Sequence, residues 1–109
     1  MTEKNSYIFF VTAPSMEEAR KIGKYVVENR LAACANLIRN IDSIYRWKGK
    51  IEKDTEVLVL LKTTENKAER LIGAIESIHS YDTPECVGIK IEKGSKKYLR
   101  WLNKMVNEN

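Results

Sequence analysis

Two stretches of this chain are apolar at successive positions. Residues 8–11 read Ile-Phe-Phe-Val, and residues 57–61 read Val-Leu-Val-Leu-Leu. Successive side chains of a strand point to opposite faces of its sheet, so both stretches predict central strands that are buried on both faces. Neither stretch approaches the roughly 18 apolar residues that a membrane-spanning helix needs, so we expect no membrane partner.

Local signals predict the remaining elements. Ser15 and Glu18 form a capping-box pattern, in which the Ser15 hydroxyl caps a helix and Glu18 reaches back to the N–H of the cap residue. Thr64 with Glu65 is expected to cap the second helix, and Ser95 the third. The predicted order is strand 7–12, helix 15–30, a long strand 31–47 bent near 40–43, a turn at 48–49, strand 51–62, helix 64–79, strand 87–91 and helix 95–106.

This order fits an α+β, ferredoxin-like βαββαβ sandwich with an additional C-terminal helix and a long hairpin between its second and third strands. We expect one domain over residues 1–109, with two helices on one face of an antiparallel sheet and the strands of Cys34 and Cys86 at opposite edges. Because the two central strands are apolar on both faces, the face away from these two helices is also apolar and should be buried. The third helix is expected to cover only part of it. We therefore expect a homo-oligomer whose sheets pack together, with edge pairing as one route.

Composition narrows the class of protein. With 43% hydrophobic residues, the chain is expected to build its core without a cofactor or metal ion. The net charge is +4, but acidic and basic residues are well mixed and only residues 93–104 are locally basic, so we expect no nucleic acid partner. Two cysteines and an N-terminus without a secretion signal predict reduced thiols and a cytoplasmic location.

His79 is the only histidine, and it follows the second predicted helix. One interpretation is structural, because a protonated imidazole is favoured near the C-terminus of a helix. The other is functional, because His79, Tyr81 and Glu85 share one short loop and suit a polar pocket or part of a metal site. Both interpretations stay open at this point.

Cys34 and Cys86 are weaker candidates for metal ligands. Thiolates suit Cu(I) or zinc, but a thiol in a core strand is commonly inert. The sequence contains no closely spaced Cys or His motif of the kind that binds zinc within one chain. Because the two cysteines are predicted at opposite edges of the sheet, their thiols could meet only through a neighbouring subunit.

Catalytic motifs are missing from the sequence. Neither a nucleophile signature nor a glycine-rich phosphate loop occurs, so no reaction class is expected. The aromatic residues Tyr45, Trp47, Tyr98 and Trp101 suit base stacking or packing between subunits, and we favour packing because the RNA-recognition signature is lacking.

Six segments stand out along the chain: residues 11–15, 30–36, 43–49, 56 with 62–63, 79–85 and 98–101. In order and spacing they resemble the CutA divalent-cation tolerance family, and the resemblance covers nearly the whole chain, from about Tyr7 to Val106. The family usually has proline after its loop histidine and an aliphatic residue after its glutamate, where this chain has Ser80 and Cys86. Ser80 makes the loop less rigid, and Cys86 either adds a thiol to the site or fills an apolar position.

The resemblance implies a tight homotrimer, a cytoplasmic location, a link to tolerance of copper and other divalent metal ions, and no established catalytic activity. It implies Cys34 and His79 as metal ligands, with Glu85 as an oxygen donor, in a cleft between subunits. The cleft residues carried over without a ligand role are Trp47, Lys62, Tyr81 and Trp101.

The leading hypothesis is thus a non-enzymatic trimer that binds Cu²⁺, or other divalent cations, between its subunits and contributes to the response to metal ions. One alternative is a small-molecule-binding signalling trimer of the nitrogen-regulatory type, which rests on analogy of fold. Another is a non-catalytic structural scaffold whose cleft residues serve packing.

Overall fold

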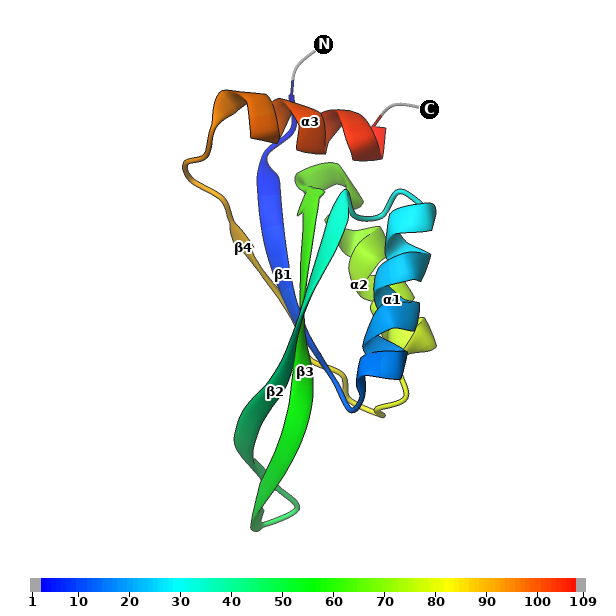
Figure 1. Ribbon diagram of the computed structural model, residues 1–109, viewed down its shortest axis with the longest axis vertical. Coiled ribbons are helices and arrows are strands. Elements are labelled where there is room, and N and C mark those ends of the chain that lie inside the picture. The colour runs from blue at the N-terminus through cyan, green and yellow to red at the C-terminus, as the bar shows by residue number, and fades with distance from the viewer. Residues whose placement is uncertain (1–2, 108–109) are drawn as a thin grey trace.

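The computed structural model describes residues 3–107, so the predicted domain limits at 1 and 109 lie outside the described part. The predicted order of elements is confirmed (Figure 1). The elements are β1 (Ser6–Ala13), α1 (Met16–Glu28), β2 (Cys34–Trp47), β3 (Lys50–Thr64), a 3₁₀ turn (Glu65–Lys67), α2 (Ala68–Ile78), β4 (Cys86–Lys90) and α3 (Lys96–Asn107).

The four strands form one antiparallel sheet in the order β2-β3-β1-β4. The two doubly apolar strands β1 and β3 are central, and the strands of Cys34 and Cys86 are the two edges, as expected. Figure 1 shows α1 and α2 on one side of the sheet and α3 across one end of it. The α+β architecture predicted from the sequence is therefore present.

The main core lies between the sheet and the helices α1 and α2. Alternate residues of β1 and β3 face it, and Phe9, Val11 and Leu61 are almost completely buried. Their helix partners include Ile22 of α1 and Leu71 of α2. This core explains why the two central strands are apolar on the face that points toward α1 and α2.

The other face of the sheet is the open sheet face. Residues paired directly across a sheet share a face, and Phe10 is paired with both Leu60 and Val87. Val87 and Ile89 of β4 are each 57% exposed. The apolar side chains of the open sheet face are Ile8, Phe10, Ile38, Leu58, Leu60, Val87 and Ile89.

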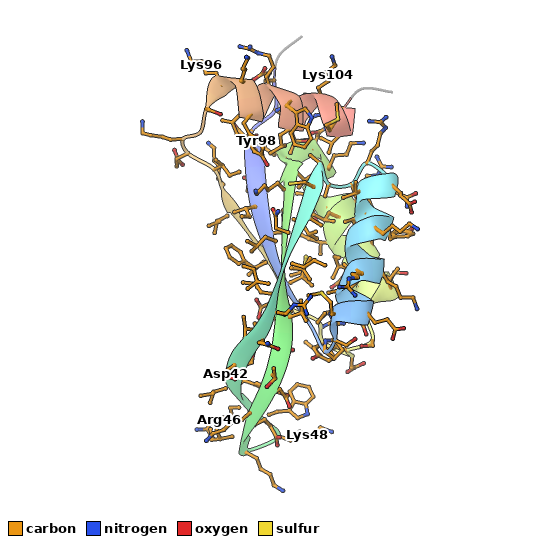
Figure 2. All side chains as sticks on the ribbon, in the orientation of Figure 1. Asp42, Arg46, Lys48, Lys96, Tyr98 and Lys104 are labelled. Atoms are coloured by element: carbon orange, nitrogen blue, oxygen red, sulfur yellow. The ribbon has the colours of Figure 1, made fainter. Side chains whose placement is uncertain are left out.

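The hairpin of β2 and β3 extends beyond the rest of the molecule (Figures 1 and 2). With the hairpin included, the described chain measures 50 × 25 × 22 Å. The predicted bend is confirmed as a register shift between Ile38 and Ile41, where Asn40 has a φ of 62°. Lys48 and Gly49, both at positive φ, make the tight turn that twisted hairpins favour.

Two predicted helix starts need correction. The Ser15 hydroxyl accepts the N–H of Glu18 at 3.2 Å as expected, but the Glu18 carboxylate bonds to Ser80 instead of reaching back. Thr64 is still in β3, and its hydroxyl donates to Asn66 rather than capping α2. A 3₁₀ turn therefore separates β3 from α2, which begins at Ala68.

Candidate functional site

His79 is fixed by hydrogen bonds at both ring nitrogens. Its side chain is fully buried, and Nε2 lies 2.7 Å from the carbonyl oxygen of Thr12 at the end of β1. A carbonyl only accepts, so Nε2 carries the proton and donates. The N–H of Tyr81 donates to Nδ1 at 3.0 Å, which makes Nδ1 the unprotonated nitrogen. Neither nitrogen is free in this arrangement.

Glu18 of α1 holds the loop that follows His79. The N–H of Ser80 donates to Glu18 Oε2 at 2.9 Å, and this oxygen also lies 3.4 Å from His79 Nδ1. Burial alone would raise the pKa of Glu18, but hydrogen bonds from Ser80 and the positive charge of Lys21 outweigh it and lower the pKa below its usual value. The loop is thus attached to both α1 and β1.

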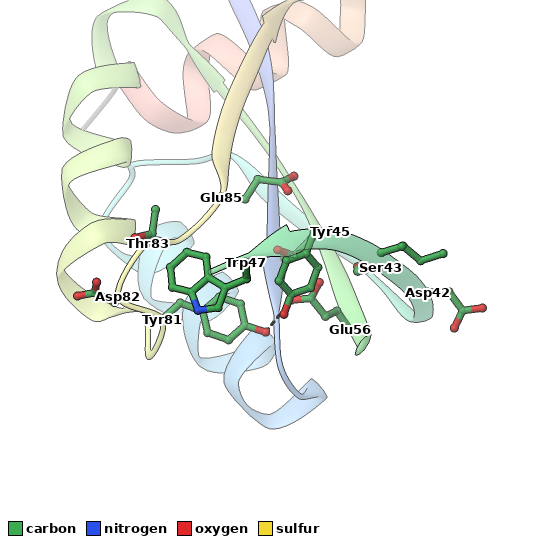
Figure 3. A pocket seen from close by; sticks show the side chains of 11 residues that line it. Asp42, Ser43, Tyr45, Trp47, Glu56, Tyr81, Asp82, Thr83 and Glu85 are labelled. Atoms are coloured by element: carbon green, nitrogen blue, oxygen red, sulfur yellow. Dashed lines mark hydrogen bonds between the residues drawn. The ribbon is translucent and has the colours of Figure 1, made fainter. Parts of the chain in front are cut away.

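A cavity of about 680 Å³ lies between the hairpin of β2 and β3 and the loop after α2 (Figure 3), and we call it the hairpin cavity. Tyr81 extends across it from the loop, and its hydroxyl donates to Oε2 of Glu56 at 2.6 Å. Glu56 of β3 is only 7% exposed. The lining residues are Thr12, Asp42, Ser43, Ile44, Tyr45, Trp47, Glu56, Tyr81, Asp82, Thr83 and Glu85.

The two tyrosine hydroxyls of the hairpin cavity both donate to carboxylates. Tyr45 bonds to Asp54 on the paired strand, and this bond raises the pKa of Tyr45 to about 12. Burial, followed by the bond to Glu56, raises the pKa of Tyr81 as well. Both phenols are therefore protonated donors at neutral pH, so the negative charge of the cavity belongs to its carboxylates.

Cys34 lies at the other end of the sheet, where α3 crosses it. Its Sγ lies 3.6 Å from the hydroxyl of Tyr98, and Nζ of Lys62 lies 5.5 Å from the centroid of the Tyr98 ring. The rings of Tyr98 and Trp101 are 5.5 Å apart. Burial and the contact with Cys34 raise the pKa of Tyr98 against the opposing influence of Lys62.

The predicted site residues therefore form two groups. Trp47, Tyr81 and Glu85 line the hairpin cavity, with His79 buried beside it, whereas Cys34, Lys62 and Trp101 lie near α3. Within residues 3–107, no three His, Cys, Asp or Glu side chains are grouped so that they could hold a metal ion.

The separation of the two groups follows from strand register. Cys34 and Ile8 both pair with Lys62, whereas His79 contacts Thr12, four residues further along β1. Four residues of a strand span roughly 13 Å. Cys34 and His79 of one chain thus do not meet at a single ion.

Two residues were missing from the sequence-based site. Glu56 is buried under Tyr81, and Tyr45 lines the same cavity. Residue 56 is among the positions that resemble the family, and it is the charged residue directly before the apolar stretch at 57–61, but neither signal marks its side chain as buried. Cys86 packs against the core, and burial raises its pKa to about 11, which favours the second sequence interpretation of this residue, an apolar filler.

Comparison with known proteins gives the family. The protein family described as "CutA1 divalent ion tolerance protein" matches residues 7–105 of this chain. "Protein CutA" of Mus musculus is 45% identical over 96 residues, which are 88% of this chain and 54% of that protein. The chain thus spans about half the length of this curated relative.

Two further relatives cover the chain along most of their own length. The "Divalent-cation tolerance protein CutA" of Thermus thermophilus is 43% identical over 87% of this chain and 92% of that protein. The structure titled "Periplasmic divalent cation tolerance protein CutA" from Archaeoglobus fulgidus superposes with a TM-score of 0.90 and 39% identity, over 94% of this chain and 99% of that chain. No helix among the described residues is long and apolar enough to cross a membrane. By family match, by identity and by fold, this chain belongs to the CutA divalent ion tolerance family.

Proposed function

We propose that this chain acts in divalent-cation tolerance as a homotrimer that binds Cu²⁺, or another divalent metal ion, in clefts between its subunits. The role is binding rather than catalysis. The observation that carries the proposal is the position of Cys34 at the border of the open sheet face, in register with Ile8 and Lys62.

Association through the open sheet face supports the trimer. Seven apolar side chains lie on this face, and three of them are about half exposed or more. Contiguous apolar surface of this kind mostly marks a protein interface. Packing a second copy there surrounds Cys34 with side chains of another chain.

The donor chemistry supports a soft or borderline metal ion. A cysteine thiolate, an imidazole nitrogen and a carboxylate are the ligands that copper and zinc use in proteins. One chain supplies these donors as Cys34, His79 and Glu85 at separate places. A site between subunits, with each chain giving part of its ligands, is the arrangement that reconciles this spacing with a common ion.

The test is calorimetric titration of metal-free protein with Zn²⁺ and with Cu²⁺. Zn²⁺ is included because it binds thiolates without oxidising them. We expect saturable binding at a fixed ratio per subunit that is lost in Cys34→Ser and in His79→Ala. Cys86→Ser is the matched control, since it removes a thiol that packs against the core.

Circular dichroism and the mass of each variant in solution show whether it is folded and assembled. If Zn²⁺ and Cu²⁺ bind equally well to folded Cys34→Ser and Cys86→Ser, Cys34 is not a ligand. A monomeric mass for the wild-type protein would remove the cleft between subunits altogether. The cytoplasmic location remains part of the proposal, and cell fractionation tests it.

A further inference from the structure

The positive charge of this chain is concentrated in one segment. Residues 93–104 hold five of the 19 basic residues and none of the 15 acidic residues. The rest of the chain therefore carries 14 basic and 15 acidic residues, a net charge of −1 against +4 for the whole chain. Charge asymmetry of this kind is typical of a protein with an anionic partner.

Helix α3 places four of these five cations on one face. An α-helix completes a turn every 3.6 residues, so these four positions lie within an arc of about 100° around the helix axis. We call them the basic stripe: Lys96, Lys97, Arg100 and Lys104. All four side chains are exposed, and Figure 2 shows Lys96 and Lys104 pointing away from the sheet.

The charges of the basic stripe are poorly neutralised. Among residues 3–107 the ion pairs are Arg100 with Glu3, at 3.5 Å, and His79 with Glu18, so the three lysines of the stripe have no carboxylate partner in this part of the chain. The Arg100 pair is itself weak, because its two side chains are 67% and 52% exposed. The first turn of α3 contains two lysines and no acidic residue, although the N-terminus of a helix disfavours cations. The stripe therefore lowers the stability of the helix that carries it.

The opposite face of α3 is already buried. Leu102 and Val106 are almost completely buried, and they form a small core with Ala33. An amphipathic helix that binds a bilayer inserts its apolar face below the lipid headgroups, and this face of α3 is occupied by the protein itself. Cations on an exposed helix face can contact the phosphates of a nucleic acid without any insertion. The structure therefore favours a nucleic acid over a membrane as the anionic partner.

The spacing of the basic stripe suits a phosphodiester backbone. Lys96, Arg100 and Lys104 follow one another at intervals of four residues, which is a rise of roughly 6 Å along the helix axis. This interval is comparable with the distance between successive phosphates of one strand. A strand that lies along α3 can thus place neighbouring phosphates beside neighbouring cations.

We propose that the basic stripe binds the phosphate backbone of a single nucleic acid strand without reading its base sequence. From composition we expected no nucleic acid partner, because acidic and basic residues are well mixed over most of the chain. The gathering of unpaired cations on one exposed face of α3 changes that expectation. The proposal goes beyond metal binding and uses none of the proposed metal ligands.

Fluorescence anisotropy of a labelled oligouridine RNA, titrated with the full chain in metal-free buffer, tests this proposal. If each of the four cations neutralises one phosphate, the logarithm of the binding constant should fall with the logarithm of the salt concentration at a slope of about −3. Binding should then be roughly fiftyfold weaker at about 200 mM salt than at about 50 mM. Because the contacts are to phosphates, oligouridine and oligoadenosine should bind within about threefold of each other.

Two triple variants form a matched pair, because each replaces three exposed lysines by glutamine. We expect the stripe variant to weaken RNA binding at least about tenfold and the hairpin variant to leave it within about threefold of wild type. The stripe variant removes cations from the first turn of α3, so its melting midpoint should equal or exceed that of wild type. Weaker binding then reflects lost phosphate contacts rather than unfolding. The stripe variant is Lys96→Gln with Lys97→Gln and Lys104→Gln, and the hairpin variant is Lys48→Gln with Lys50→Gln and Lys53→Gln.

Three results would overturn the proposal. Equal weakening by the two triple variants would indicate diffuse attraction, and the absence of saturable RNA binding at about 50 mM salt would exclude the partner. Tighter binding to phosphatidylserine vesicles than to RNA would identify the stripe as a membrane contact instead.

Zn²⁺ titration of the same variants separates this proposal from metal binding. We expect Zn²⁺ binding to survive in the stripe variant and RNA binding to survive in Cys34→Ser, so either proposal can fail without the other. Loss of RNA binding in folded Cys34→Ser would contradict the basic stripe as the site.

Discussion

Replacing Ile89 by serine tests whether the open sheet face is an interface between copies of this chain. Ile89 of β4 is 57% exposed and belongs to the apolar side chains of the open sheet face. Full burial of an isoleucine side chain contributes about 1.5–3 kcal/mol, so covering the exposed part contributes roughly 0.9–1.7 kcal/mol per subunit. For three subunits, Ile89→Ser should cost roughly 3–5 kcal/mol of assembly free energy, or about a hundredfold to a few thousandfold in the assembly constant.

Sedimentation velocity over a dilution series measures this change. Where the assembly is too tight to dissociate by dilution, the shift of the unfolding midpoint in guanidinium at two protein concentrations gives the same quantity. Ile78→Ser is the matched control, because Ile78 is 36% exposed at the end of α2 on the helical side. Ile89→Ser assemblies as stable as those of wild type, or equal effects of the two variants, would refute the assignment of the interface.

Three further predictions concern the fold and its ionisable groups. Gly88→Ala should destabilise the protein by about 1–3 kcal/mol in urea unfolding, because the new Cβ would lie 2.6 Å from the ring of buried Phe9. The pKa of Glu18 is lowered in the folded chain, so its contribution to stability is complete well above pH 4.5 and is lost as the pH falls through the lowered value. Melting curves of Glu18→Gln should therefore differ from wild type at pH 7, and the difference should shrink as the pH falls below 4.5. Absorbance titration at 295 nm should show Tyr45 ionising at about pH 12, and Asp54→Asn should bring that ionisation down toward 10, whereas an unchanged titration would contradict the hydrogen bond.

The order of elements was predictable because hydrophobic periodicity decides it. Residues 8–11 and 57–61 are apolar at successive positions, and they form the two central strands. The bulge near Asn40 was also predictable, since polar residues interrupt the alternation there. The starts of the helices were less predictable. The spacing of Ser15 and Glu18 fits a local capping pattern, but the N–H of Ser80 binds the Glu18 carboxylate instead. A contact between residues 62 positions apart is invisible to a local pattern.

The candidate site was predicted residue by residue but not in its grouping. The family resemblance named Cys34 and His79 together, and only strand register shows that they lie far apart in one chain. Glu56 was missed for a related reason. Charged residues are frequent along 50–56 in the sequence, and burial under Tyr81 is what distinguishes Glu56 from half-buried Glu52 and exposed Asp54 of the same strand.

Metal binding by His79 would have to be coupled to a movement of the loop that follows it. Nδ1 is the unprotonated nitrogen, so it is the one that can bind an ion without losing a proton, but it already accepts the N–H of Tyr81. An ion at Nδ1 displaces that N–H, at a cost of about 0.5–1.5 kcal/mol if water replaces the bond. Glu18 Oε2, 3.4 Å away, offers a second donor and compensates in part. Because Tyr81 also covers Glu56, the same movement would alter the hairpin cavity. Metal binding at His79 should therefore be coupled to the conformation of the hairpin cavity even though Glu56 is not among the ligands of the ion.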